Sequence, residues 1–206
     1  PRFSRNNCSI ARAQELVEVF FEYPAGLLFV RTSFSWGWID AKTLLSAPLE
    51  GSELEFWLNH ANRYFTREEI QLNGKTYPKG SFFTGDAHEI HLAEELAFTK
   101  LSKVSGLIDT HRPLTRKTFL ETLFSFLFDE YGWGGHLGRR DCSRLLLDVM
   151  KSFGLRIPRH SADQALASSF TIDTSKMTDS DQKLRILDEA HKQGIVFLHF
   201  PGHVMA

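Results

Sequence analysis

The chain has 206 residues, of which 42% are hydrophobic and 13% aromatic, enough for one ordinary domain or two small ones with hydrophobic cores. Its 24 basic and 25 acidic side chains leave a formal net charge of -1, so no bulk field favours nucleic acid or an anionic membrane as a partner. The sequence contains no apolar stretch of about 18 or more residues that would indicate a membrane span. Only two cysteines occur, Cys8 and Cys142. They lie far apart in the sequence and in dissimilar settings, so their spacing does not indicate a disulfide framework.

The first fifty residues combine helix formers with two short strand patterns. The run from Ile10 to Val19 is rich in helix formers and is broken at Pro24. After this turn, Leu27 to Val30 and Gly37 to Ile39 predict the two strands of a hairpin with a polar, aromatic loop.

Residues 51–110 suit a second strand-rich module, which follows a break at Ala47 to Gly51. The dipeptide Asn73-Gly74 is a strong hairpin signal. Pro78 restricts the strand after it to a sheet edge or a turn. Leu92 to Leu107 mixes apolar and charged residues, and we expect it to be the linker into the C-terminal part.

The residue pattern of the C-terminal part predicts helices first and strands after them, an order that is typical of the α+β class. Helical spacing of apolar residues predicts a helix from Thr115 to Phe128 with Thr115 as its N-cap, and Ser161 to Ser169 suits a short helix. The apolar run from Ile195 to Phe200 predicts a buried strand, and His203 begins a second one.

A further helix is predicted to begin directly after Asp141. Its apolar positions recur with helical spacing and mark one buried face, and Gly154 closes it: Cys142, Leu145, Leu146, Val149, Met150 and Phe153. Asp141 is a favourable N-cap, so Cys142 falls in the first turn, where unpaired N–H groups and the helix dipole favour a thiolate. A reactive thiol and a buried structural cysteine both fit this stretch, since free cysteines are often buried.

Several pieces of the sequence together resemble the NlpC/p60 family of cell-wall cysteine peptidases. They are Tyr131-Gly132-Trp133-Gly134-Gly135, Asp141-Cys142-Ser143, Ile157-Pro158-Arg159 with Ser161 and Gln164, Thr115-Arg116, and Pro201-Gly202-His203. The resemblance implies a papain-like catalytic domain over residues 111–206. Trp36 to Ile39 is similar to a strand of bacterial SH3-like barrels, which implies a partial barrel over residues 1–50 and a second barrel with linker over residues 51–110.

The family resemblance implies that Cys142 is the nucleophile and His203 its base, 61 residues further along. His136 is the nearest rival in sequence, but the family has no base there. His199 is expected to be a packed or exposed strand residue. No His or Cys pair has zinc-site spacing, so neither a metal nor another cofactor is expected.

The resemblance also implies the supporting roles around the nucleophile. Tyr131 would help to polarise the scissile carbonyl, or would only anchor the glycine turn. Asp141 would meet the free amine of a substrate while also capping the helix. Ser143 and Ser161 would line the pocket, or would be local cap and turn hydroxyls. Trp36 is the barrel residue expected at the substrate cleft.

The sequence departs from the family pattern at several places. The family commonly has a small residue at the position of Arg144, and an asparagine or small polar residue at that of His160. Arg159, which belongs to the matching signature, could pair with a substrate carboxylate, but we expect a solvated arginine. The third catalytic residue of the family would lie beyond Ala206, so we expect a fragment truncated inside its C-terminal strands, and a secretion signal that was removed or lies upstream of Pro1.

The leading hypothesis is a bacterial cell-envelope enzyme, periplasmic or secreted, that cleaves the γ-D-glutamyl to diamino acid bond of peptidoglycan stem peptides or muropeptides. One alternative is hydrolysis of another amide, or acyl transfer, on the same fold. Another is a catalytically impaired module that only binds cell-wall fragments. The oligomeric state is open.

Overall fold

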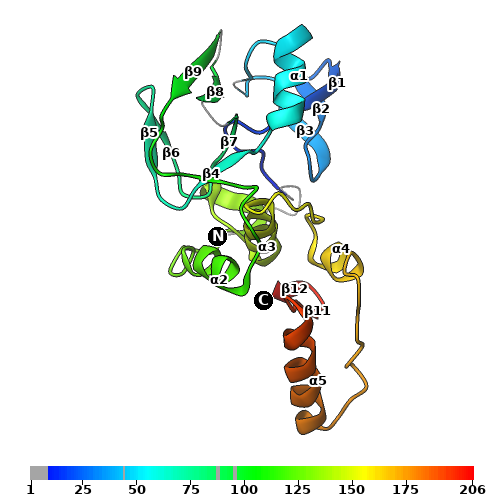
Figure 1. Cartoon of the computed structure of the whole chain (residues 1–206). Coiled ribbons are helices and arrows are strands. Elements are labelled where there is room, and N and C mark those ends of the chain that lie inside the picture. The colour runs from blue at the N-terminus through cyan, green and yellow to red at the C-terminus, as the bar shows by residue number, and fades with distance from the viewer. Residues whose placement is uncertain (1–8, 44, 87–88, 95–96) are drawn as a thin grey trace.

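The computed structural model describes residues 9–43, 45–86, 89–94 and 97–206. Its elements are small antiparallel sheets followed by a mainly helical part (Figure 1). The predicted α+β class is confirmed, while the SH3-like identity of the N-terminal sheets stays a prediction. Cys8 and His88 lie outside the described residues.

The N-terminal sheet has the order β1 (Glu18–Tyr23), β2 (Leu27–Arg31) and β3 (Trp36–Asp40). The hairpin predicted for β2 and β3 is confirmed, with Phe29 opposite Trp38 in the antiparallel register. The helix formers of residues 10–19 do not form a helix. They form a turn and then enter β1, whose β-branched and aromatic side chains favour a strand.

Helix α1 (Gly51–His60) follows, and the second sheet has the order β10-β4-β7-β8-β9. The Asn73-Gly74 hairpin is confirmed between β5 and β6, and both turn residues have positive φ. The expected linker is wrong over much of its length, because residues 98–102 form β9, which pairs with β8. The strands and hairpin are β4 (Tyr64–Thr66), β5 (Ile70–Leu72), β6 (Lys75–Tyr77), β7 (Phe82–Gly85), β8 (Glu89–Ala93), β9 (Phe98–Ser102) and β10 (Leu107–Asp109).

The predicted N-cap of α2 (Arg116–Phe124) is confirmed, since the Thr115 side chain accepts a hydrogen bond from the backbone N–H of Thr118. Helix α3 (Cys142–Lys151) packs against α2, and the side chains of Phe119, Phe126, Val149 and Phe153 form one buried cluster there. Later elements are α4 (Ser161–Leu166), α5 (Ser180–Gln193), β11 (Leu198–Phe200) and β12 (His203–Met205), and α5 was not predicted.

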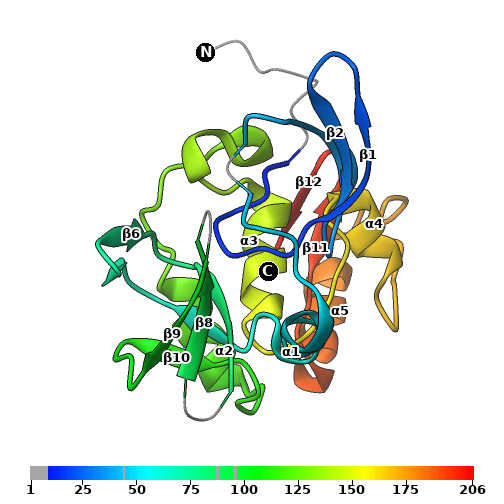
Figure 2. The same ribbon diagram turned by 90° about the horizontal axis from the view of Figure 1, so that it is seen from above.

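Helix α3 (Cys142–Lys151) lies near the middle of the molecule in both views (Figures 1 and 2), and in Figure 1 it lies between the N-terminal sheets and the strands β11 and β12. Strand β12 packs against α3 and α4, with the side chain of Val204 buried. This central position lets α3 contact segments from both ends of the sequence.

Candidate active site

Helix α3 begins at Cys142, as predicted, because Asp141 caps it. The Asp141 Oδ1 atom accepts a hydrogen bond from the backbone N–H of Arg144 at 2.8 Å. Cys142 itself is a half-buried free thiol in the first turn.

The glycine-rich segment folds back over the start of α3. Gly132 donates its N–H to the Arg140 carbonyl at 2.9 Å, and Gly134 donates its N–H to Asp141 Oδ2 at 3.1 Å. Gly134 has a φ of 59°, in the left-handed region that favours glycine. These bonds bring the segment that carries Tyr131 back to the start of α3.

Tyr131 therefore lies beside Cys142, and the residue is 54% exposed. Burial raises the pKa of the Tyr131 phenol, and the neighbouring Cys142 and Asp141 raise it further. A phenol with a raised pKa stays protonated at neutral pH and remains a hydrogen-bond donor. The structure thus brings together two of the three predicted catalytic side chains.

His203, the third, is exposed at the start of β12, where it pairs with Phe200 of β11. The strand packs against α3, so His203 and Cys142, the predicted base and nucleophile, lie on neighbouring elements. In the part of the chain that the structure describes, no hydrogen bond joins His203 to Cys142.

The predicted substrate contacts lie at different places. Ser143 is buried, and its Oγ accepts a hydrogen bond from Arg159 Nη1 at 2.7 Å. Ser161 is half-buried as the first residue of α4, which packs against α3. Trp36 is 57% exposed on β3, where its ring stacks on Phe20 at 5.1 Å within the N-terminal sheet.

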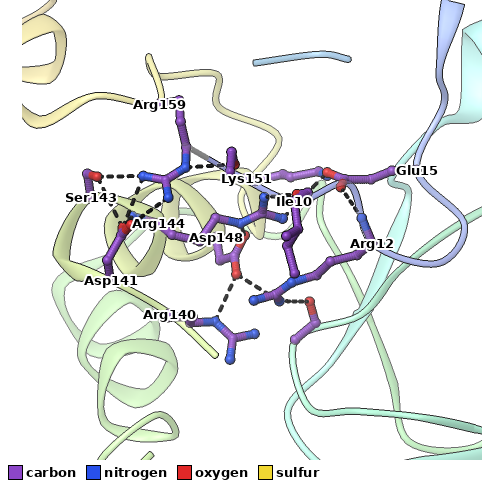
Figure 3. A network of polar contacts seen from close by, with 12 residues as sticks. Ile10, Arg12, Glu15, Arg140, Asp141, Ser143, Arg144, Asp148, Lys151 and Arg159 are labelled. Atoms are coloured by element: carbon purple, nitrogen blue, oxygen red, sulfur yellow. Dashed lines mark hydrogen bonds and ion pairs between the residues drawn. The ribbon is translucent and has the colours of Figure 1, made fainter. Parts of the chain in front are cut away.

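Arg159 is not solvated, and that expectation was wrong. Its side chain is only 4% exposed and forms a bidentate ion pair with Asp141, with Nη1 to Oδ1 at 3.0 Å and Nη2 to Oδ2 at 2.6 Å (Figure 3). Burial alone would raise the pKa of Asp141, but the hydrogen bonds from Arg159 and the backbone outweigh it and lower the pKa. Asp141 therefore stays ionised beside Cys142.

A second buried cluster surrounds Asp148, about two turns further along α3. Its carboxylate forms ion pairs with three arginines: with Arg144 Nε at 2.9 Å, Arg140 Nε at 2.8 Å and Arg12 Nη1 at 3.0 Å (Figure 3). Burial would raise the pKa of Asp148, but the three arginines together hold it well below its ordinary value. The cluster explains how a large cation is accommodated at Arg144, where the family pattern has a small residue.

The N-terminal segment completes this cluster. The Glu15 side chain is buried, and its carboxylate accepts a hydrogen bond from Lys151 Nζ at 3.0 Å. Arg144 Nη1 donates a hydrogen bond to the Ile10 carbonyl at 3.1 Å. Sequence reasoning missed these partners, because spacing along the chain does not indicate contacts between residues 10–15 and α3.

Gln164 ties α4 to the same region. Its side-chain nitrogen donates to the carbonyls of Ser143 at 2.9 Å and Pro158 at 2.8 Å. The glutamine of the sequence signature thus contacts the first turn of α3.

No helix among the described residues has the length and apolar character of a membrane span. Nor do these residues contain a group of three or more His, Cys, Asp and Glu side chains that could hold a metal ion.

Residues 129–204 match the model of the NlpC/P60 family. Two solved structures have similar folds. An NlpC/P60 endopeptidase from Photobacterium damselae subsp. piscicida is 18% identical, with a TM-score of 0.58 over 72% of this chain and 35% of that one. An NlpC/P60 family protein from Bacillus cereus is 17% identical, with a TM-score of 0.57 over 79% of this chain and 60% of that one.

The chain thus spans about a third of the first structure's length and 60% of the second's. No curated protein matches it. The matched segment begins just before Tyr131 and includes Cys142 and His203. Residues 129–204 of this chain therefore form a domain of the NlpC/P60 family.

Proposed function

We propose that this chain carries the catalytic domain of a peptidoglycan hydrolase of the cysteine peptidase type, which cleaves the γ-D-glutamyl to diamino acid bond of stem peptides. One observation carries the proposal: Cys142 is the first residue of α3, with Tyr131 beside it and the strand of His203 packed against the same helix. A thiol, a base on a neighbouring element and an oxyanion donor are the parts that such a reaction needs.

In the proposed reaction the Cys142 sulfur attacks the γ-carbonyl carbon, and His203 takes the thiol proton. The Tyr131 hydroxyl and the backbone N–H of Cys142 stabilise the oxyanion. The C–N bond then breaks, and His203 gives its proton to the leaving amine. Water, deprotonated by His203, hydrolyses the thioester and restores the thiol. The His203 to Cys142 hydrogen bond would form when substrate closes the site.

The proposed substrate is a muropeptide or stem peptide with a free amine. Asp141 would meet that amine, since 10% of its side chain remains accessible. Ser143 and Ser161 would form the pocket walls, and Trp36 would contribute from the N-terminal sheet. This substrate places the protein in the cell envelope, periplasmic or secreted.

A muropeptide-binding module without catalysis is the second candidate. It is favoured by the absence, among the described residues, of a hydrogen bond between His203 and Cys142. Such a module would hold cell-wall fragments in the same pocket and release them unchanged.

Incubation with L-Ala-γ-D-Glu-diamino acid peptides, followed by mass spectrometry, tests both candidates. We expect two products from the wild type and none from Cys142→Ala, with Cys8→Ser as the matched control that loses the other thiol. His203→Gln should also abolish turnover, whereas His199→Gln on the paired strand should retain it. Product formation by Cys142→Ala would refute the proposed mechanism, and binding without products from the wild type would favour the second candidate.

A further inference from the structure

The Asp141 carboxylate receives more hydrogen bonds than a helix cap requires. Oδ1 accepts from the backbone N–H of Arg144, from Arg159 Nη1 and from Ser143 Oγ at 2.8, 3.0 and 3.2 Å. Oδ2 accepts from the backbone N–H of Gly134 at 3.1 Å and from Arg159 Nη2 at 2.6 Å. Among the described residues, Arg159 is its one ion-pair partner.

The Arg159 guanidinium is itself held in one orientation. Its Nε donates to Ser9 Oγ at 2.9 Å, and Nη1 also donates to Ser143 Oγ. The side chain thus connects the N-terminal segment, the first turn of α3 and the loop before α4. A planar guanidinium can donate in parallel to both oxygens of a carboxylate, and a lysine cannot reproduce that geometry.

We propose that Arg159 is a positioning residue for Cys142: it fixes the Asp141 cap and neutralises the carboxylate next to the nucleophile. An ionised carboxylate one residue away disfavours a thiolate, because the two negative charges repel. The guanidinium cancels that charge and leaves the helix dipole to favour the thiolate. The inference rests on the proposed role of Cys142 as nucleophile.

Other charged or titratable groups also lie around the thiol. Tyr131 lies beside Cys142, and β12 and α4, which pack against α3, carry His203 and Asp163. Helix α2 packs further along α3, near Val149 and Phe153. All these groups are unchanged in the variants below, so a shift between variants reports on the Asp141 and Arg159 pair.

The test is the rate of alkylation of Cys142 by iodoacetamide across pH, followed by mass of the peptide that contains Cys142, so that Cys8 is measured separately. We expect Arg159→Met to raise the midpoint of the profile by about one pH unit, which slows alkylation below the midpoint about tenfold. Arg159→Lys should shift it less. Arg156→Met is the matched control, because Arg156 is exposed and only three residues away, and its profile should equal the wild type.

Asp141→Asn should move the midpoint of the alkylation profile in the opposite direction. The amide oxygen can still cap the helix, but Arg159 loses its counter-charge, so the midpoint should fall. This variant carries the test if Arg159→Met does not fold. An unchanged midpoint in folded Arg159→Met, or a midpoint that rises or stays unchanged in Asp141→Asn, overturns the inference.

Because alkylation needs no peptide substrate, it separates this inference from the proposed function. The expected midpoint shifts without peptide cleavage would sink only the proposed function. Cleavage by the wild type without those shifts would sink only the role of Arg159.

Discussion

Replacing Asp148 by Asn should be among the most destabilising polar substitutions in this chain. Asp148 is the shared anion of three guanidiniums, and its side chain is fully buried. Asparagine keeps one acceptor for Arg144 Nε, but its NH₂ group would face the donors of Arg140 and Arg12. Removing one partner of a buried ion pair costs about 3–5 kcal/mol.

That loss is a large part of a typical unfolding free energy of about 5–15 kcal/mol. At about 2–4 °C per kcal/mol for a chain of this size, the midpoint of thermal unfolding should fall by roughly 6–20 °C. Urea unfolding followed by circular dichroism measures the free energy directly. Asp188→Asn on α5 is the matched control, since Asp188 pairs with Lys192 at an exposed position and should cost about 0–1 kcal/mol.

The pH dependence gives a second measurement with a fixed sign. Because the folded pKa of Asp148 is lowered, its contribution is fully present above its unfolded pKa of about 4 and is lost as the pH falls towards the folded pKa. The difference between wild type and Asp148→Asn should therefore be largest above about pH 4 and narrow below it. A cost equal to that of Asp188→Asn, or a difference that grows on acidification, would refute the reasoning.

Three further outcomes are expected. Gly80→Ala should lower the free energy of unfolding by about 1–3 kcal/mol more than Gly74→Ala does. Both glycines have positive φ, but only a Cβ at Gly80 would overlap the Arg140 guanidinium. Equal losses of free energy in urea unfolding would contradict this. Tyr131→Phe should lower kcat on stem peptides about 10²–10³-fold, as expected for a lost oxyanion donor, and an unchanged kcat would remove Tyr131 from the mechanism. Thr115→Ala should cost about 1 kcal/mol in the same unfolding assay, since it removes the cap of α2, and a cost near zero would show that the cap is dispensable.

The parts of the site that are local in sequence could be predicted. Asp141 and the helical spacing after Cys142 define the start of α3, and the cap lies within three residues of its donor. The Asn73-Gly74 turn is equally local, because it depends on the backbone preferences of two residues.

The parts that depend on distant partners could not be predicted. Arg159 reads as a surface residue until Asp141 and Ser9 are known to lie beside it. The strand at residues 98–102 mixes charged and apolar side chains, because β9 lies at the edge of its sheet and needs only partial burial. Nothing in that pattern distinguishes such a strand from a polar linker.

The contacts between residues 10–15 and α3 also bear on the order of folding. The bond from Arg144 to Ile10 spans 134 residues, and that from Lys151 to Glu15 spans 136. Pairings of such high contact order form slowly, because the chain between them must first be brought together. Until then, Asp148 has only its local partners Arg140 and Arg144. We therefore expect the first turn of α3, with its thiol, to reach its final environment late, when the two ends of the sequence meet.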